Sequence, residues 1–119
     1  DEDDQSSDQV VEMDPNADPC AALNSPGAHI APVNFFIDSF DYVKQDRRRW
    51  ATAVIAGDQP GACTGGFGDA EYAGRLEQFV TSTGANGIFS SICVGDLTPA
   101  LEDALNTFTV ACDNFVPII

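Results

Sequence analysis

The sequence has little positive charge. Its 119 residues contain five Lys and Arg against 19 Asp and Glu, a formal net charge of -14. Binding to nucleic-acid phosphates or to an anionic membrane surface relies on Lys and Arg, so we expect neither partner. Three of the five basic residues are adjacent, at Arg47, Arg48 and Arg49. They could contact an acidic partner, but compensation of the chain's own negative loop explains them as well, and we favour this intramolecular role.

Long hydrophobic runs are also missing. The longest, such as ATAVIAG at residues 51–57, are far shorter than the roughly 20 residues that span a bilayer, so we expect no membrane insertion by this chain. No segment resembles a signal peptide. Because the sequence does not begin with Met, we expect that a leader or a preceding segment has been removed.

The usual signatures of catalysis are absent. His29 is the only histidine, and neither G-x-S-x-G nor a P-loop occurs. The glycine-rich stretch GACTGGFGDAE at 61–71 lacks the G-x-G-x-x-G spacing of dinucleotide-binding loops, so it predicts a flexible loop tied down by Cys63. We therefore expect no enzymatic activity.

The four cysteines, Cys20, Cys63, Cys93 and Cys112, form an even set without a C-x-x-C pair. With a single histidine beside them, this spacing argues against a zinc site and favours disulfides in an oxidising compartment. Four reduced, buried thiols are the alternative. We accordingly expect a secreted, periplasmic or cell-surface protein.

The hydrophobic pattern predicts one α/β domain preceded by an acidic loop region at residues 1–31. Within residues 32–119, helical spacing occurs from Pro32 to about Arg49, from Tyr72 to about Gly84, and from Leu97 to Cys112. The third helix would have Thr98 as its N-cap. The apolar run WATAVIAG, without polar alternation, predicts a strand at 50–57 that is covered on both faces. GIFSSIC predicts a second strand at 87–93, and the glycine-rich segment at 58–70 predicts a loop.

This alternation of helices and strands predicts a partial doubly wound, Rossmann-like parallel sheet with flanking helices. Two strands are too few to cover the apolar faces of three helices, so the sequence resembles the back half of an α/β domain. Parallel neighbours would bring their carboxyl ends together, which favours a Cys63–Cys93 disulfide. Cys20–Cys112 would follow by elimination.

Several segments together resemble the second half of von Willebrand factor type A (VWA) domains of bacterial surface and secreted proteins. They are DEDDQS at 1–6, AVIAG followed by PGAC, YAGRLEQFVTSTGANGIFSSIC at 72–93, and DLTPALEDALNTF at 96–108. In that family an Asp at a strand end helps to hold Mg²⁺ or another divalent cation, and Asp1 matches it. The Asp-x-Ser-x-Ser ligands belong to the first half of the fold and do not occur here.

The acidic start of the chain is therefore a candidate cation site. The resemblance implies a remnant of a metal site at Asp1, to which Asp3 and Asp4 could add oxygen ligands for Mg²⁺ or Ca²⁺. The same stretch almost fits an EF-hand calcium loop, but Ser6 stands where glycine makes the sharp turn. A solvated acidic loop remains the alternative.

From these patterns we expect a non-enzymatic extracellular binding or adhesion module, the C-terminal portion of a VWA-like domain. Its partner would be a protein or cell-surface ligand, with a divalent cation as a potential participant. The alternative is a structural or scaffold domain of a secreted or envelope protein, without a ligand of its own.

Overall fold

The structure, a computed structural model, describes residues 31–58, 61–66 and 68–118. The candidate metal ligands Asp1, Asp3 and Asp4, and also Cys20, lie outside the described residues. In chain order the elements are α2 (Val33–Lys44), the 3-10 turn η1 (Arg47–Arg49), β1 (Thr52–Ala56), β2 (Ala62–Gly65), β3 (Gly68–Glu71) and α3 (Gly74–Ser82). They are followed by the 3-10 turn η2 (Gly84–Asn86), β4 (Gly87–Ser91), the 3-10 turn η3 (Ile92–Val94) and α4 (Thr98–Asp113).

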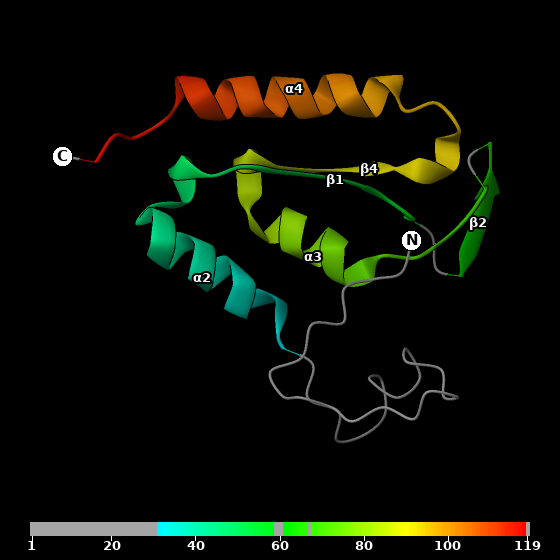
Figure 1. Cartoon of the computed structure of the whole chain (residues 1–119), viewed down its shortest axis with the longest axis horizontal. Coiled ribbons are helices and arrows are strands. Elements are labelled where there is room, and N and C mark those ends of the chain that lie inside the picture. Colours follow the sequence, from blue (N-terminus) through cyan, green and yellow to red (C-terminus); the bar gives the residue numbers. More distant parts are fainter. Residues whose placement is uncertain (1–30, 59–60, 67, 119) are drawn as a thin grey trace.

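Strands β1 and β4 form the predicted parallel pair. Their register runs from Thr52 opposite Gly87 to Ala56 opposite Ser91. Helix α4 covers one face of this pair, and α3 and α2 lie on the other (Figure 1). The α/β class and the parallel pairing are therefore confirmed. Every residue of both strands is only half-buried, so the cover on both faces expected for the strand at 50–57 is incomplete within the part of the chain that the structure describes.

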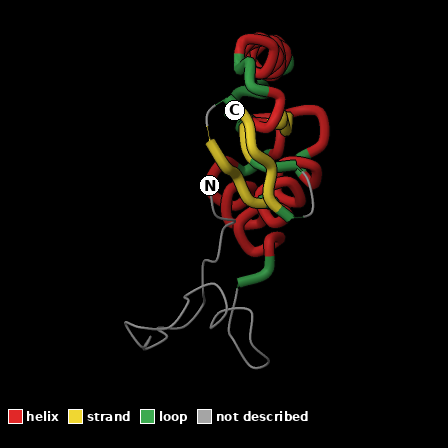
Figure 2. Tube along the Cα trace, turned by 90° about the vertical axis from the view of Figure 1, so that its right-hand side faces the viewer, coloured by secondary structure: helices red, strands yellow, loops and turns green. Residues whose placement is uncertain are grey.

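The predicted loop at 58–70 is wrong. Strands β2 and β3 form an antiparallel hairpin there, with Ala62 opposite Glu71 and Gly65 opposite Gly68. The hairpin lies beyond the carboxyl ends of β1 and β4, and Figure 2 shows its two strands in front of the helices. Gly68 has φ +108°, a left-handed conformation that glycine adopts without strain. This allows the chain to reverse direction within a segment that otherwise reads as a loop.

The first predicted helix is shorter than expected. Helix α2 ends at Lys44, because Gln45 adopts a left-handed conformation with φ 67°. Asp46 then caps η1 by accepting a hydrogen bond from the Arg48 backbone N–H. Arg49 donates to the Lys44 carbonyl oxygen over 3.2 Å, so a basic residue does lie at the negative end of the helix dipole.

The N-cap of α4 also differs from the prediction. Leu97 precedes the helix, and Thr98 is its first residue. The Asp96 carboxylate accepts the Thr98 backbone N–H over 2.9 Å. This hydrogen bond holds the pKa of the Asp96 carboxyl below its ordinary value. Asp96 thus replaces Thr98 as the residue that satisfies the start of the helix.

The main core lies between α2, α3 and the entry to β1. Val33, Ile37 and Trp50 are buried there, with Phe79 packed against them. The Trp50 indole donates to Asp41 Oδ1 over 2.9 Å. Arg47 Nε also donates to this carboxylate over 2.8 Å. The hydrogen bond from Arg47, more than that from Trp50, holds the pKa of the Asp41 carboxyl below its usual value.

The three adjacent arginines all have partners within the chain. Arg47 binds Asp41, and Arg48 binds Asp46. Arg49 donates to the backbone oxygens of Val116 and Pro117. The basic run therefore has an intramolecular role, since these side chains fasten η1 to α2 and to the C-terminal tail. These partners are not in the acidic loop region, and compensation of that loop stays a prediction, because residues 1–30 lie outside the described residues.

Candidate functional site

A concave surface lies at the carboxyl end of β1. It is a cavity of about 320 Å³ between the end of β1, the β2–β3 hairpin, the start of α3 and η3. Its lining residues are Ile55, Ala56, Gly57, Cys63, Gly68, Asp69, Ala70, Ala73, Leu76 and Ile92. In open parallel sheets, ligands bind outside the carboxyl ends of the strands, so this position is the expected one for a site.

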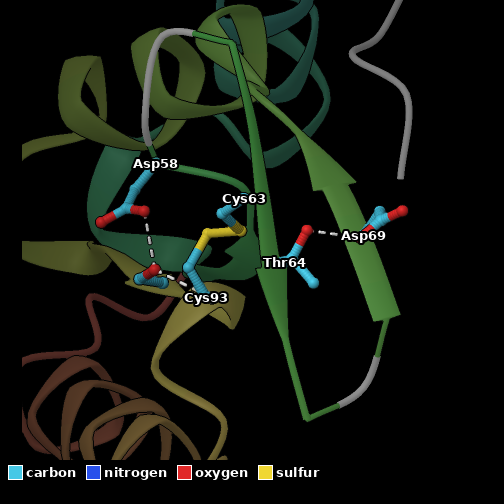
Figure 3. The surroundings of a disulfide bond; sticks show 6 residues. Asp58, Cys63, Thr64, Asp69 and Cys93 are labelled. Carbon is cyan, nitrogen blue, oxygen red and sulfur yellow. Dashed lines mark hydrogen bonds between the residues drawn. A yellow bond between two sulfur atoms is a disulfide. The ribbon is translucent and has the colours of Figure 1, made fainter.

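A disulfide holds the hairpin over this cavity. Cys63 on β2 is bonded to Cys93 in η3, with their Cα atoms 5.8 Å apart (Figure 3). The predicted Cys63–Cys93 bridge is therefore confirmed. Cys93 lies in the turn after β4 rather than at the end of the strand. The covalent bond connects the hairpin to the end of the strand that pairs with β1.

The second predicted disulfide is not settled by the structure. Cys112 near the end of α4 is a free, exposed thiol. Its predicted partner, Cys20, lies outside the described residues, so the Cys20–Cys112 bridge stays a prediction.

Two hydrogen-bonded polar pairs lie near the Cys63–Cys93 disulfide (Figure 3), and one of their residues, Asp69, lines the cavity. Ser91 Oγ, at the end of β4, donates to Asp58 Oδ1 over 2.7 Å and accepts the Cys93 backbone N–H over 3.0 Å. Across the hairpin, Thr64 Oγ1 donates to Asp69 Oδ1 over 2.7 Å (Figure 3). One oxygen of each carboxylate is thereby oriented, which leaves acceptor capacity for donors on a ligand.

Close backbone packing fixes the junction between β1 and the hairpin. Gly57 forms a parallel bridge with Tyr72. A Cβ atom added at Gly57 would lie 2.0 Å from the Glu71 carbonyl oxygen, so only glycine fits there. The Ala73 backbone N–H then donates to the Gly57 oxygen over 3.0 Å. These contacts set the position of the start of α3, which forms one wall of the cavity.

The described residues provide no ready metal site. Within residues 31–58, 61–66 and 68–118, no three His, Cys, Asp or Glu side chains gather closely enough to hold an ion. Asp58 and Asp69 each have a hydroxyl partner instead. The cation site predicted at Asp1, Asp3 and Asp4 lies outside the described residues and stays a prediction. No helix in the described part of the chain is long and apolar enough to cross a membrane.

Sequence reasoning missed the polar pairs of the site. Asp58, Ser91, Thr64 and Asp69 carry no motif. The parallel pairing of β1 with β4 brings Asp58 to Ser91, and the hairpin brings Thr64 to Asp69. The sequence does contain a hairpin signal that could have located the Thr64–Asp69 pair. Two short runs, at residues 62–65 and 68–71, flank the two-residue connection Gly66-Phe67.

Comparison with known proteins adds no assignment, because no family model, curated protein or solved structure matches this chain.

Proposed function

We propose that this chain is a non-catalytic, extracytoplasmic binding module that recognises a protein or surface ligand at the carboxyl end of its parallel strands. The observation that carries the proposal is the cavity of about 320 Å³ under a hairpin that is held by the Cys63–Cys93 disulfide. Structural disulfides persist in oxidising compartments, which supports a secreted, periplasmic or cell-surface location.

The chemistry of the site indicates the kind of ligand. Apolar side chains such as Ile55, Leu76 and Ile92 line the cavity, while Asp69 adds a carboxylate. A small apolar group next to a cationic or hydrogen-bond-donating group matches such a lining. A peptide that carries an aliphatic side chain beside Lys or Arg combines both features. The net charge of -14 favours its approach.

A peptide-display selection tests this site. We expect random peptides selected on the full chain to be enriched in Lys or Arg next to aliphatic residues, and Asp69→Arg to weaken their binding at least about tenfold. Asp103→Arg, the same charge change at an exposed position on α4, is the matched control and should keep most of the affinity. Circular dichroism checks that both variants fold. Selected peptides that bind the two variants equally well would contradict the assignment of the cavity.

The VWA-like character of the module, with a divalent cation as cofactor, is a further part of the proposal. The parallel β1–β4 pair with helices on both faces supports it. If Asp1, Asp3 and Asp4 hold Mg²⁺ or Ca²⁺, a saturating cation raises the free energy of unfolding by about 2.7 kcal/mol at 100 times its Kd.

Thermal unfolding with Mg²⁺, with Ca²⁺ and with a chelator measures this effect. We expect the cation-dependent rise in Tm to disappear when Asp1, Asp3 and Asp4 are replaced by Asn. The control, Glu102→Gln with Asp103→Asn on α4, should preserve the rise. An unchanged Tm in all three solutions would favour the second candidate function, a structural or scaffold domain without its own ligand. The internal pairing of Arg47, Arg48 and Arg49 favours that candidate, because it leaves the basic run with a structural role.

A further inference from the structure

Helix α4 packs on the sheet through its small side chains and leaves its large ones uncovered. Ala100, Ala104 and Ala111 are buried. Leu101, Leu105 and Phe108 are 55%, 66% and 40% exposed. The sequence places these three large residues on one face of the helix, and such an apolar face normally lies against the core. Here it is the alanine face that contacts β1 and β4.

The uncovered residues form one continuous line. Leu101, Leu105, Phe108 and Cys112 follow one another at intervals of four, three and four residues, and Phe115 follows three residues later. We call these five residues the α4 stripe. From Leu101 to Cys112 it extends over roughly 16 Å of helix. The spacing is that of a helix seam, in which side chains of a second helix fit between those of the first.

One end of the α4 stripe opens into a groove. A cavity of about 210 Å³ lies between Phe108, Cys112 and Phe115 on one side and Trp50 and Ala51 on the other. Its walls are predominantly apolar side chains and the stems of two arginines. A large apolar side chain inserted there would be surrounded on several sides, which is the environment of an anchor residue at a protein interface.

Charge identifies the kind of occupant. The helix carries Glu102, Asp103 and Asp113 and no Lys or Arg. At the groove Arg48 is paired with Asp46, and Arg49, which donates to neutral oxygens, is one positive charge against the three carboxylates of α4. A second copy of this chain would bring the same acidic helix and another net charge of -14 to the interface.

We propose that the α4 stripe is a docking surface for an amphipathic helix that carries apolar residues at the same spacing, flanked by Lys or Arg. The apolar residues cover the stripe, with one large side chain in the groove beside Trp50. The basic flanks lie against the acidic residues of α4. This is the helix-in-groove form of recognition. The α4 stripe lies on the opposite face of the sheet from the hairpin cavity, so docking there does not depend on the ligand proposed above.

The test uses labelled helical peptides and the full chain. The probe has about 16 residues, with Leu at intervals of four, three and four and with Lys and Ala elsewhere. One comparison peptide carries Glu in place of Lys. Another has the probe's composition in scrambled order, which retains the charge and loses the apolar line. Fluorescence anisotropy should give a Kd for the probe that is at least about tenfold lower than for either comparison peptide.

Protein variants locate the binding. Leu101→Ser with Leu105→Ser should raise the Kd of the probe at least about tenfold. Both positions are exposed, so the fold is retained. The matched control is Tyr42→Ser with Val43→Ser on α2, which removes two exposed apolar side chains away from α4. A probe Cys opposite Cys112, activated as its 2-thiopyridyl disulfide, should form a mixed disulfide with the Cys112 thiol and release 2-thiopyridone, and Cys112→Ser should abolish this reaction.

Two results would overturn the proposal. The first is equal binding of the probe and the scrambled peptide, because it would reduce the interaction to attraction between a cationic peptide and an acidic protein. The second is a dimer in sedimentation experiments that Leu105→Ser dissociates, because a second copy would then be the occupant. Asp69→Arg provides the distinction from the proposed function, since it should leave binding of the probe unchanged.

Discussion

Replacing Trp50 by Ala is expected to lower the free energy of unfolding by about 3–5 kcal/mol, a large part of the total stability of a domain of this size. The side chain is only 8% exposed. Its ring stacks on Phe40 with 5.0 Å between centroids, and the Phe79 ring lies at 6.0 Å. Removing it leaves a cavity at the centre of the main core, which the surrounding helices can fill only in part.

The polar contacts of Trp50 add to this effect. Its indole N–H donates to Asp41 Oδ1, and the Arg47 guanidinium carbon lies 5.5 Å from the ring centroid. Trp50→Phe keeps most of the apolar ring and removes the donor. We expect it to cost about 1.5–3 kcal/mol, the usual value for a hydrogen bond to a charged group.

Urea unfolding followed by far-ultraviolet circular dichroism measures both variants, since Trp50 is the only tryptophan and fluorescence would be lost with it. Tyr42→Ala is the control. That side chain is 85% exposed, so the change should alter stability by less than about 0.5 kcal/mol. A loss below about 1 kcal/mol for Trp50→Ala would contradict the central place of this residue in the core.

The sequence predicted the regular elements because their periodicity is strong. Val33 and Ile37 recur at helical spacing, and β1 and β4 are short segments with few polar residues between helical patterns, so the helix–strand alternation and the parallel pairing could both be expected. Element ends were less predictable. The end of α2 before Arg49 depends on the left-handed backbone of Gln45 and on the cap that Asp46 provides to η1. Hydrophobic periodicity contains no information about either.

The candidate site was only partly predictable. Its disulfide followed from the parallel strands, because their carboxyl ends meet at one edge of the sheet. The hairpin could not be predicted in this way, because Gly65, Gly66 and Gly68 are typical of a loop, although the backbone on either side of the turn forms an antiparallel ladder. The Asp58–Ser91 pair joins residues 33 positions apart, a contact that tertiary structure alone produces.

The α4 stripe shows a different limit. Periodicity correctly places Leu101, Leu105 and Phe108 on one face, yet it cannot tell which face of the helix the sheet selects. The alanine face allows α4 to lie close to β1 and β4, where larger side chains would hold the helix further away. The apolar residues remain exposed because only two strands underlie α4 in the described part of the chain.

The Cys63–Cys93 disulfide is expected to contribute about 3–4 kcal/mol to stability. The two cysteines are 30 residues apart, and closing a loop of that length removes conformational entropy from the unfolded chain. The double change Cys63→Ser with Cys93→Ser should therefore lower the urea midpoint markedly. Cys112→Ser should leave the midpoint unchanged if this exposed thiol is free, and a fall in the midpoint would instead support the predicted Cys20–Cys112 bridge. A double variant with the midpoint of the unmodified protein would contradict this contribution.

The loss should be concentrated in the hairpin. Among its described residues only Ala70 is buried, so few apolar contacts remain there once the covalent bond is gone. Amide hydrogen exchange should accelerate first in β2 and β3, while amides in β1 and β4 keep their protection until global unfolding. Because the hairpin forms one wall of the cavity, Asp69-dependent peptide binding should disappear in the double variant, whereas binding of the helical probe to the α4 stripe should persist.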